Sequence, residues 1–96
     1  MNPDQVQEAI IEVLGEIQTI SGRILTPMNS TTCPIGDLPG FDSLNGIEAT
    51  LQISEKFGYD FPLDNLLIDD TGHRALTISE VAERVCQLME AKAVTK

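Results

Sequence analysis

One serine stands where the residue types and their spacing could support chemistry. Ser43 follows the proline- and glycine-containing stretch 37–42 and opens a segment with helical periodicity. The first N–H groups of a helix lack intrahelical partners, and the helix dipole points its positive end toward them. A hydroxyl there is accessible to a second enzyme, and a phosphate esterified to it meets a favourable electrostatic environment. On the triplet Asp42-Ser43-Leu44 alone, however, a helix cap is the simpler interpretation.

The rest of the chain offers no partners for nucleophilic or metal chemistry. A serine hydrolase needs a base and an orienting acid, yet the lone His73 lies in a distant connection and neither His nor Lys neighbours Ser43. Cys33 and Cys86 are far apart and form no CxxC pair, so we expect no zinc site. We interpret both as small apolar residues of a reduced chain, with a Cys33–Cys86 disulfide as the alternative. We therefore expect no catalytic residue and no metal.

Length and charge limit the classes of partner. Ninety-six residues suffice for one domain, spanning 1–96. Fifteen acidic residues against six basic ones give a net charge of −9, which argues against nucleic acid and anionic membranes and favours partners with basic patches. The longest apolar runs, such as 66–68, are too short to span a bilayer, and the N-terminus lacks the features of a signal peptide. We expect a cytoplasmic monomer.

Apolar periodicity and capping signals predict a small all-α, four-helix bundle with three main helices and one short one. We expect a long loop over 22–42 that wraps over the helices, anchored by Ile24, Leu25, Ile35, Leu38 and Phe41, and a frayed tail over 91–96. The expected helices are about 3–20, 43–57, 62–68 and 77–90.

Two of these helices carry clear N-terminal signals. In the first, Asn2 and Gln5 form a capping-box-like pattern, and in the last, Thr77 and Glu80 form a T-x-x-E capping box. The first helix has an apolar stripe that we expect to face the core: Val6, Ile10, Val13, Leu14, Ile17 and Ile20. A second row is acidic and predicts a solvated face: Asp4, Glu8, Glu12 and Glu16.

An ordered set of motifs resembles the acyl carrier protein family from the first helix to Met89. The triplet Asp-Ser-Leu is a weak signal alone, but the combination at these spacings is specific. Its members are, in chain order, Asp42-Ser43-Leu44, then Glu48, Leu51 and Phe57, then Tyr59-Asp60-Phe61-Pro62, and finally Thr77-Ile78-Ser79-Glu80-Val81.

The resemblance implies that Ser43, flanked by Asp42 and Leu44, is the attachment point of 4′-phosphopantetheine. A phosphopantetheinyl transferase would donate this group from coenzyme A, and the arm would carry acyl intermediates as thioesters for fatty-acid or related biosynthesis. The protein would then be a carrier and not an enzyme. Basic patches of partner enzymes would dock on the second main helix at Leu44, Ile47, Glu48, Leu51 and Glu55.

Departures from the family pattern leave other functions open. Asn45 stands where an acidic residue often follows Asp-Ser-Leu, and Ser54 and Lys56 also replace common acids. Gly46 is costly inside a helix, by roughly 1 kcal/mol against alanine, and close approach of the arm or of a partner is one explanation. The alternatives are a specialised carrier of aminoacyl or polyketide intermediates, or a helical interaction module that is never modified.

Overall fold

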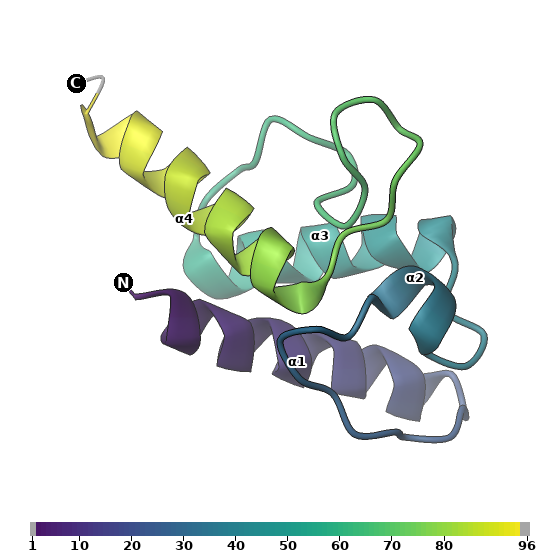
Figure 1. The fold of residues 1–96 in the computed structure, drawn as a ribbon. Helices are drawn as coiled ribbons and strands as arrows, with labels where there is room; N and C mark the ends of the chain where they lie inside the picture. Colours follow the sequence, from purple (N-terminus) through teal and green to yellow (C-terminus); the bar gives the residue numbers. More distant parts are fainter. Residues whose placement is uncertain (1, 95–96) are drawn as a thin grey trace.

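The computed structural model describes residues 2–94, with side chains described as far as residue 90. Over this range the chain forms four helices and no strand (Figure 1). This confirms the predicted all-α bundle with three main helices and one short helix. The helices are α1 (Pro3–Ile20), α2 (Pro34–Asp37), α3 (Ser43–Phe57) and α4 (Ile78–Val94).

The core lies where α3 and α4 pack on α1. At the start of α1, Asn2 Oδ1 accepts from Gln5 N at 2.9 Å and Gln5 Oε1 accepts from Asn2 N at 3.4 Å, so the predicted capping box is confirmed. The apolar stripe of α1 is buried except for its last member, Ile20, which is 80% exposed. That expectation was wrong because the other helices do not cover the final turn of α1. The buried apolar side chains of the three long helices are Val6, Ile10, Val13, Leu14, Ile17, Ala49, Ile53, Ile78, Val81, Ala82 and Val85.

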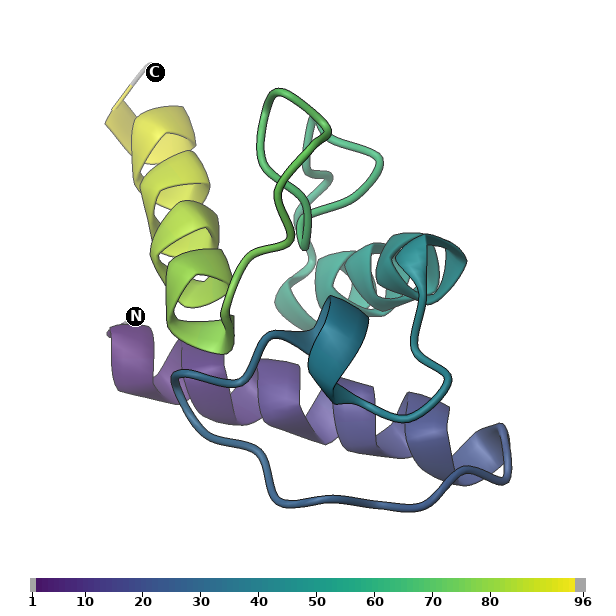
Figure 2. The same ribbon diagram turned by 45° about the vertical axis from the view of Figure 1, so that its right-hand side comes forward.

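The connection between α1 and α3 wraps back over the bundle, as predicted (Figure 2). The carbonyls of Thr32 and Ser30 accept from the N–H groups of Ile78 and Ser79 at 2.8 and 3.0 Å, which satisfies orphan donors at the start of α4. Of the five expected anchors, Leu38 and Phe41 are buried and Ile35 is partly buried, whereas Ile24 and Leu25 are exposed and do not anchor the loop.

The short helix is not where the sequence suggested. It lies inside the predicted loop, at α2, where Pro34 occupies the first turn and Asp37 Oδ2 accepts from Cys33 N at 2.8 Å. The expected helix over 62–68 does not form. There the chain is irregular, because Leu66 N donates to the Thr50 hydroxyl at 2.8 Å and not to a carbonyl of its own segment. Hydrogen bonds to other segments thus take the place of the backbone hydrogen bonds that a helix would form within itself.

Side chains of α3 and α4 hold the irregular segment from both sides. Arg84 on α4 donates to the carbonyls of Leu66 and Ile68 and pairs with Asp70 at 2.6 Å. Leu66 and its neighbour Leu67 are both completely buried between these elements. The segment closes with an isolated antiparallel bridge from Ile68 to Ala75.

The last helix is longer than predicted. The expected range was 77–90, whereas α4 runs from Ile78 to Val94, so the helix extends into the expected tail, of which residues 95–96 lie outside the described residues. Thr77 and Glu80 form the predicted capping box, in which Glu80 N donates to the Thr77 hydroxyl at 3.3 Å and Thr77 N donates to Glu80 Oε1 at 2.9 Å.

Candidate functional site

Ser43 is the first residue of α3 and its side chain is exposed. The cap is its neighbour Asp42, whose Oδ1 accepts from Leu44 N at 3.0 Å and from Asn45 N at 3.1 Å. Asn45 Oδ1 accepts from Asp42 N at 3.2 Å, which completes a capping box. The capping function belongs to Asp42 and Asn45, so the Ser43 hydroxyl is left for other chemistry.

The backbone beneath Ser43 is held by the irregular segment between α3 and α4. Asn65 Nδ2 donates to the Ser43 carbonyl at 2.9 Å, and Asn65 Oδ1 accepts from Leu67 N at 3.0 Å. Gly46 makes this contact possible, since a Cβ added there would lie 2.6 Å from Asn65 Oδ1. The close approach that explains this helical glycine is therefore intramolecular, and neither an arm nor a partner is needed to account for it.

A second network fixes the loop before Ser43. Arg23 Nη1 donates to Asn45 Oδ1 at 3.0 Å and to Gln18 Oε1 at 3.2 Å, and the buried Gln18 donates from Nε2 to the Pro39 carbonyl at 2.8 Å. Gly40 has φ +69°, and a Cβ there would lie 2.8 Å from Arg23 Nε. Asn45 thus joins the helix cap to the end of α1, a role that its position after Leu44 did not reveal.

The five predicted docking residues all lie on exposed parts of α3. Leu44 is 72% and Leu51 62% exposed, with Ile47 between them less so. Glu48 and Glu55 follow Leu44 and Leu51 by four residues each, so they share one side of the helix. The structure therefore brings the residues together as an apolar row bordered by carboxylates; that partners dock on it stays a prediction.

The remaining chemically capable residues do not converge on Ser43. His73 belongs to the turn 69–74, where its N–H donates to Asp69 Oδ1 at 3.3 Å, and this turn is joined to the start of α4 by an Arg74–Glu80 ion pair of 3.0 Å. Within the described part of the chain, no group of three or more His, Cys, Asp or Glu side chains could hold a metal ion. The geometry offers Ser43 as an acceptor of a group brought from outside.

Both cysteines are half-buried free thiols. Burial raises the pKa of the Cys33 thiol, with the charge of Asp37 adding to the effect. Burial likewise raises the pKa of the Cys86 thiol, assisted by Glu90. Since the thiolate is the nucleophile and metal ligand, both side chains are poorly reactive near neutral pH. This agrees with the expectation that they serve as small apolar residues.

The sequence missed an open groove between α1 and α3. Six residues line it: Val13, Glu16, Ile20, Gln52, Glu55 and Lys56. The exposed Ile20 forms one end of this groove. The sequence signal for its exposure is its spacing: Ile20 follows Glu16 by four residues and so continues the row of acidic, solvent-facing positions.

No described helix is both long enough and apolar enough to cross a membrane. Comparison of the chain with protein-family models, with curated proteins and with solved structures gave no match. The resemblance to acyl carrier proteins therefore stays a prediction, and the function has to be inferred from the residues around Ser43.

Proposed function

We propose that this chain is an acyl carrier protein modified at Ser43 with 4′-phosphopantetheine. The observation that carries the proposal is that Ser43 is exposed on the first turn of α3 while Asp42 provides the cap. Its hydroxyl can reach an outside enzyme without any loss of capping bonds. A phosphodiester on this oxygen would also lie near the positive end of the α3 dipole, which stabilises negative charge.

The modification needs no base from this chain. The Ser43 oxygen would form a bond to the β-phosphorus of coenzyme A, and the bond from that phosphorus to the adenosine 3′,5′-bisphosphate leaving group would break. The hydroxyl proton would pass to a base of the phosphopantetheinyl transferase. The arm then ends in a thiol, and acyl groups attach to it as thioesters. The protein acts as a cytoplasmic carrier and performs no catalysis itself.

Partner enzymes would recognise the exposed side of α3. Leu44, Ile47 and Leu51 supply apolar contact beside Ser43, and Glu48 and Glu55 supply charge for basic patches. Exposed charge pairs mainly raise the rate of encounter and are screened by salt. Such contacts suit a monomeric carrier, which must leave each enzyme quickly.

Intact mass decides whether Ser43 is modified. The protein is incubated with coenzyme A, magnesium and a broad-range phosphopantetheinyl transferase. We expect one added phosphopantetheine on the native chain and none on Ser43→Ala, with Ser54→Ala, which lies on the same helix, modified normally. If the native chain gains no mass while an established carrier does so in the same reaction, the carrier function is wrong and an unmodified interaction module is favoured.

Docking is tested by reversing one charge. Glu48→Lys should slow the transferase reaction, most strongly at low salt, because it places a positive charge opposite a basic patch. The matched control is Glu83→Lys on α4, which makes the same change of net charge on another helix. Equal slowing by both variants would show that only the net charge of the chain matters.

One feature favours a specialised pathway over general fatty-acid synthesis. The first turn of α3 holds no acidic residue, because its third position is Asn45, which bonds to Arg23. A partner that seeks negative charge directly after Leu44 would not find it. Loading the arm with aminoacyl, polyketide and fatty acyl groups, followed by transfer assays with enzymes of each class, distinguishes these clients.

A further inference from the structure

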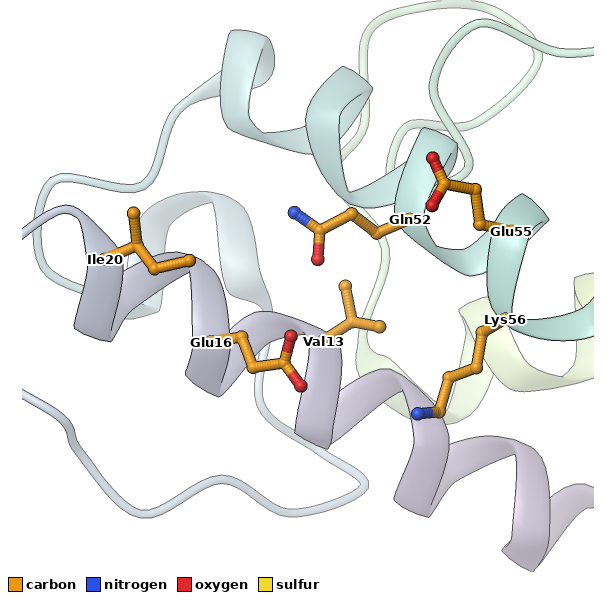
Figure 3. A pocket seen from close by; sticks show the side chains of 6 residues that line it. All are labelled: Val13, Glu16, Ile20, Gln52, Glu55 and Lys56. Carbon is orange, nitrogen blue, oxygen red and sulfur yellow. The ribbon is translucent and has the colours of Figure 1, made fainter.

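The groove between α1 and α3 combines an apolar floor with acidic rims. Its volume is ≈ 630 Å³. Figure 3 shows Val13 extending from α1 toward α3 and Gln52 and Lys56 extending from α3 toward α1, with the Glu16 side chain along α1 and Ile20 at the end of that helix. Val13 is nearly buried at the base and Ile20 is 80% exposed at one end. Because these two residues are seven apart, they lie on the same side of α1.

The charges that face the groove are predominantly negative. Among the described residues that line it, Lys56 is the only cation, and it is already paired: its Nζ lies 3.0 Å from Glu12 Oε1 and joins α3 to α1. Glu16 and Glu55 line opposite sides, and neither forms an ion pair within the described part of the chain. Carboxylates on both rims of an open groove attract cationic side chains.

A second hollow adjoins the first at Ile20. It has a volume of ≈ 330 Å³, lies over Gly15 and beside Leu25, and shares Glu16 and Ile20 with the groove. Gly15 provides this space within α1 because it has no side chain. An apolar side chain placed against Ile20 therefore finds apolar surface toward Val13 on one side and toward Leu25 on the other.

We propose that the groove binds a basic amphipathic segment of a partner protein, with an apolar side chain of that segment packed on Ile20 and Lys or Arg side chains paired with Glu16 and Glu55. The proposal rests on the proposed function in one respect: Glu55 also belongs to the docking side of α3, so one partner can span both surfaces. A second copy of this chain does not suit the groove, because each copy carries a net charge of −9. The same charge disfavours nucleic acid and anionic lipid.

The probe is a synthetic helical peptide of lysine and leucine with its leucines at i, i+3, i+4 and i+7. A peptide of equal composition with the leucines spread around the helix is the control. Each is titrated into the ¹⁵N-labelled full chain without modification at Ser43, and amide shifts report the site. We expect the amphipathic peptide to bind more tightly and to shift amides at 16, 20, 52 and 55.

Variants separate the groove from general charge attraction. Ile20→Ser should weaken binding by roughly tenfold, about the effect of losing one buried aliphatic contact. Ile24→Ser is the matched control, because Ile24 is 75% exposed and lies outside both hollows. Glu16→Gln should weaken binding more than Glu90→Gln, and the difference should shrink as salt rises.

Equal effects of Ile20→Ser and Ile24→Ser, or equal binding of both peptides, would overturn the proposal. Shifts confined to Leu44, Ile47 and Leu51 would also overturn it and place the peptide on the outer side of α3 alone. The outcome is separable from the carrier function, since the titration uses unmodified protein. If the chain binds the peptide in the groove but is never modified at Ser43, the proposed carrier function is wrong and the proposed interaction in the groove still holds.

Discussion

Removing the hydroxyl of Thr50 should loosen the segment that supports Ser43. This buried hydroxyl donates to the Gly46 carbonyl at 2.9 Å and accepts from Leu66 N at 2.8 Å. Thr50→Val keeps the size of the side chain but leaves the buried Leu66 N–H without its acceptor. An unsatisfied buried donor costs about 1–3 kcal/mol, so we expect the free energy of unfolding to fall by about 2 kcal/mol. For a domain of this size, that loss lowers Tm by about 8–16 °C.

The control is Thr50→Ser, which retains both hydrogen bonds and removes one buried methyl group, worth about 0.8 kcal/mol. Thermal and urea unfolding give the two free energies, and hydrogen exchange gives the local effect. The amide of Leu66 should exchange faster in Thr50→Val than global destabilisation accounts for, and it should not do so in Thr50→Ser. A Thr50→Val protein that is as stable as the native chain, or more stable than Thr50→Ser, would show that the Thr50 hydroxyl does not hold the Leu66 backbone to α3.

The same variant bears on the proposed site. Leu66 follows Asn65, whose side chain donates to the Ser43 carbonyl at 2.9 Å. If the segment loosens, this contact loosens with it, and the first turn of α3 loses a support from outside the helix. We therefore expect Thr50→Val to broaden the amide signals of residues 43–46 as well as those of the segment. Unchanged signals at 43–46 would show that the capping box of Asp42 and Asn45 orders the helix start without the Asn65 contact.

Two further predictions concern Gly46 and Glu80. Gly46→Ala should destabilise the protein by about 1 kcal/mol, because loss of the two Asn65 hydrogen bonds, about 1 kcal/mol each, outweighs the gain of about 1 kcal/mol in helix propensity. Adding Asn65→Ala to this variant should cost little more, because those two hydrogen bonds are already lost. If urea unfolding shows that the losses of the two single variants add fully, the proposed clash between an alanine at position 46 and Asn65 is wrong. Hydrogen bonds from the Arg74 side chain and from Thr77 N lower the pKa of Glu80 from 4.5 to about 2. Its contribution to stability is therefore complete above pH 4.5 and is lost as the pH falls toward 2. Glu80→Gln, which can still form a capping box, should show a weaker loss of stability over that range, and an unchanged pH profile would contradict this.

The three long helices were predictable because their signals are local. The starts of α1 and α4 are marked by capping partners three residues apart, Asn2 with Gln5 and Thr77 with Glu80, and all three helices carry apolar residues at helical spacing. The limits of α3 were predicted to the residue, since Asp42 caps it and Gly58 ends it with φ +62°. Contacts of this kind lie within one turn and depend little on the rest of the chain.

The candidate site was predictable in part. Ser43 at the start of α3 and the outward position of Glu48 and Glu55 follow from the same periodicity, whereas Leu44 and Leu51 were assigned to the docking side by the family resemblance. That Asn45 completes the cap and also binds Arg23, 22 residues earlier, could not be foreseen. Likewise, the sequence marks Gly46 only as a weak helix former, because the side chain that requires it, Asn65, belongs to another segment.

By itself, therefore, the sequence determined the three long helices, the capping boxes of α1 and α4 and the place of Ser43 at a helix start. The tertiary structure decided the rest: the segment 62–68 is irregular because Thr50 and Arg84 bond to its backbone, and Ile20 is exposed because no other element covers the end of α1. The physical reason is the separation of the interacting groups. Hydrogen bonds and packing within a turn are encoded by neighbouring residues, whereas those between distant segments exist only once the helices have packed.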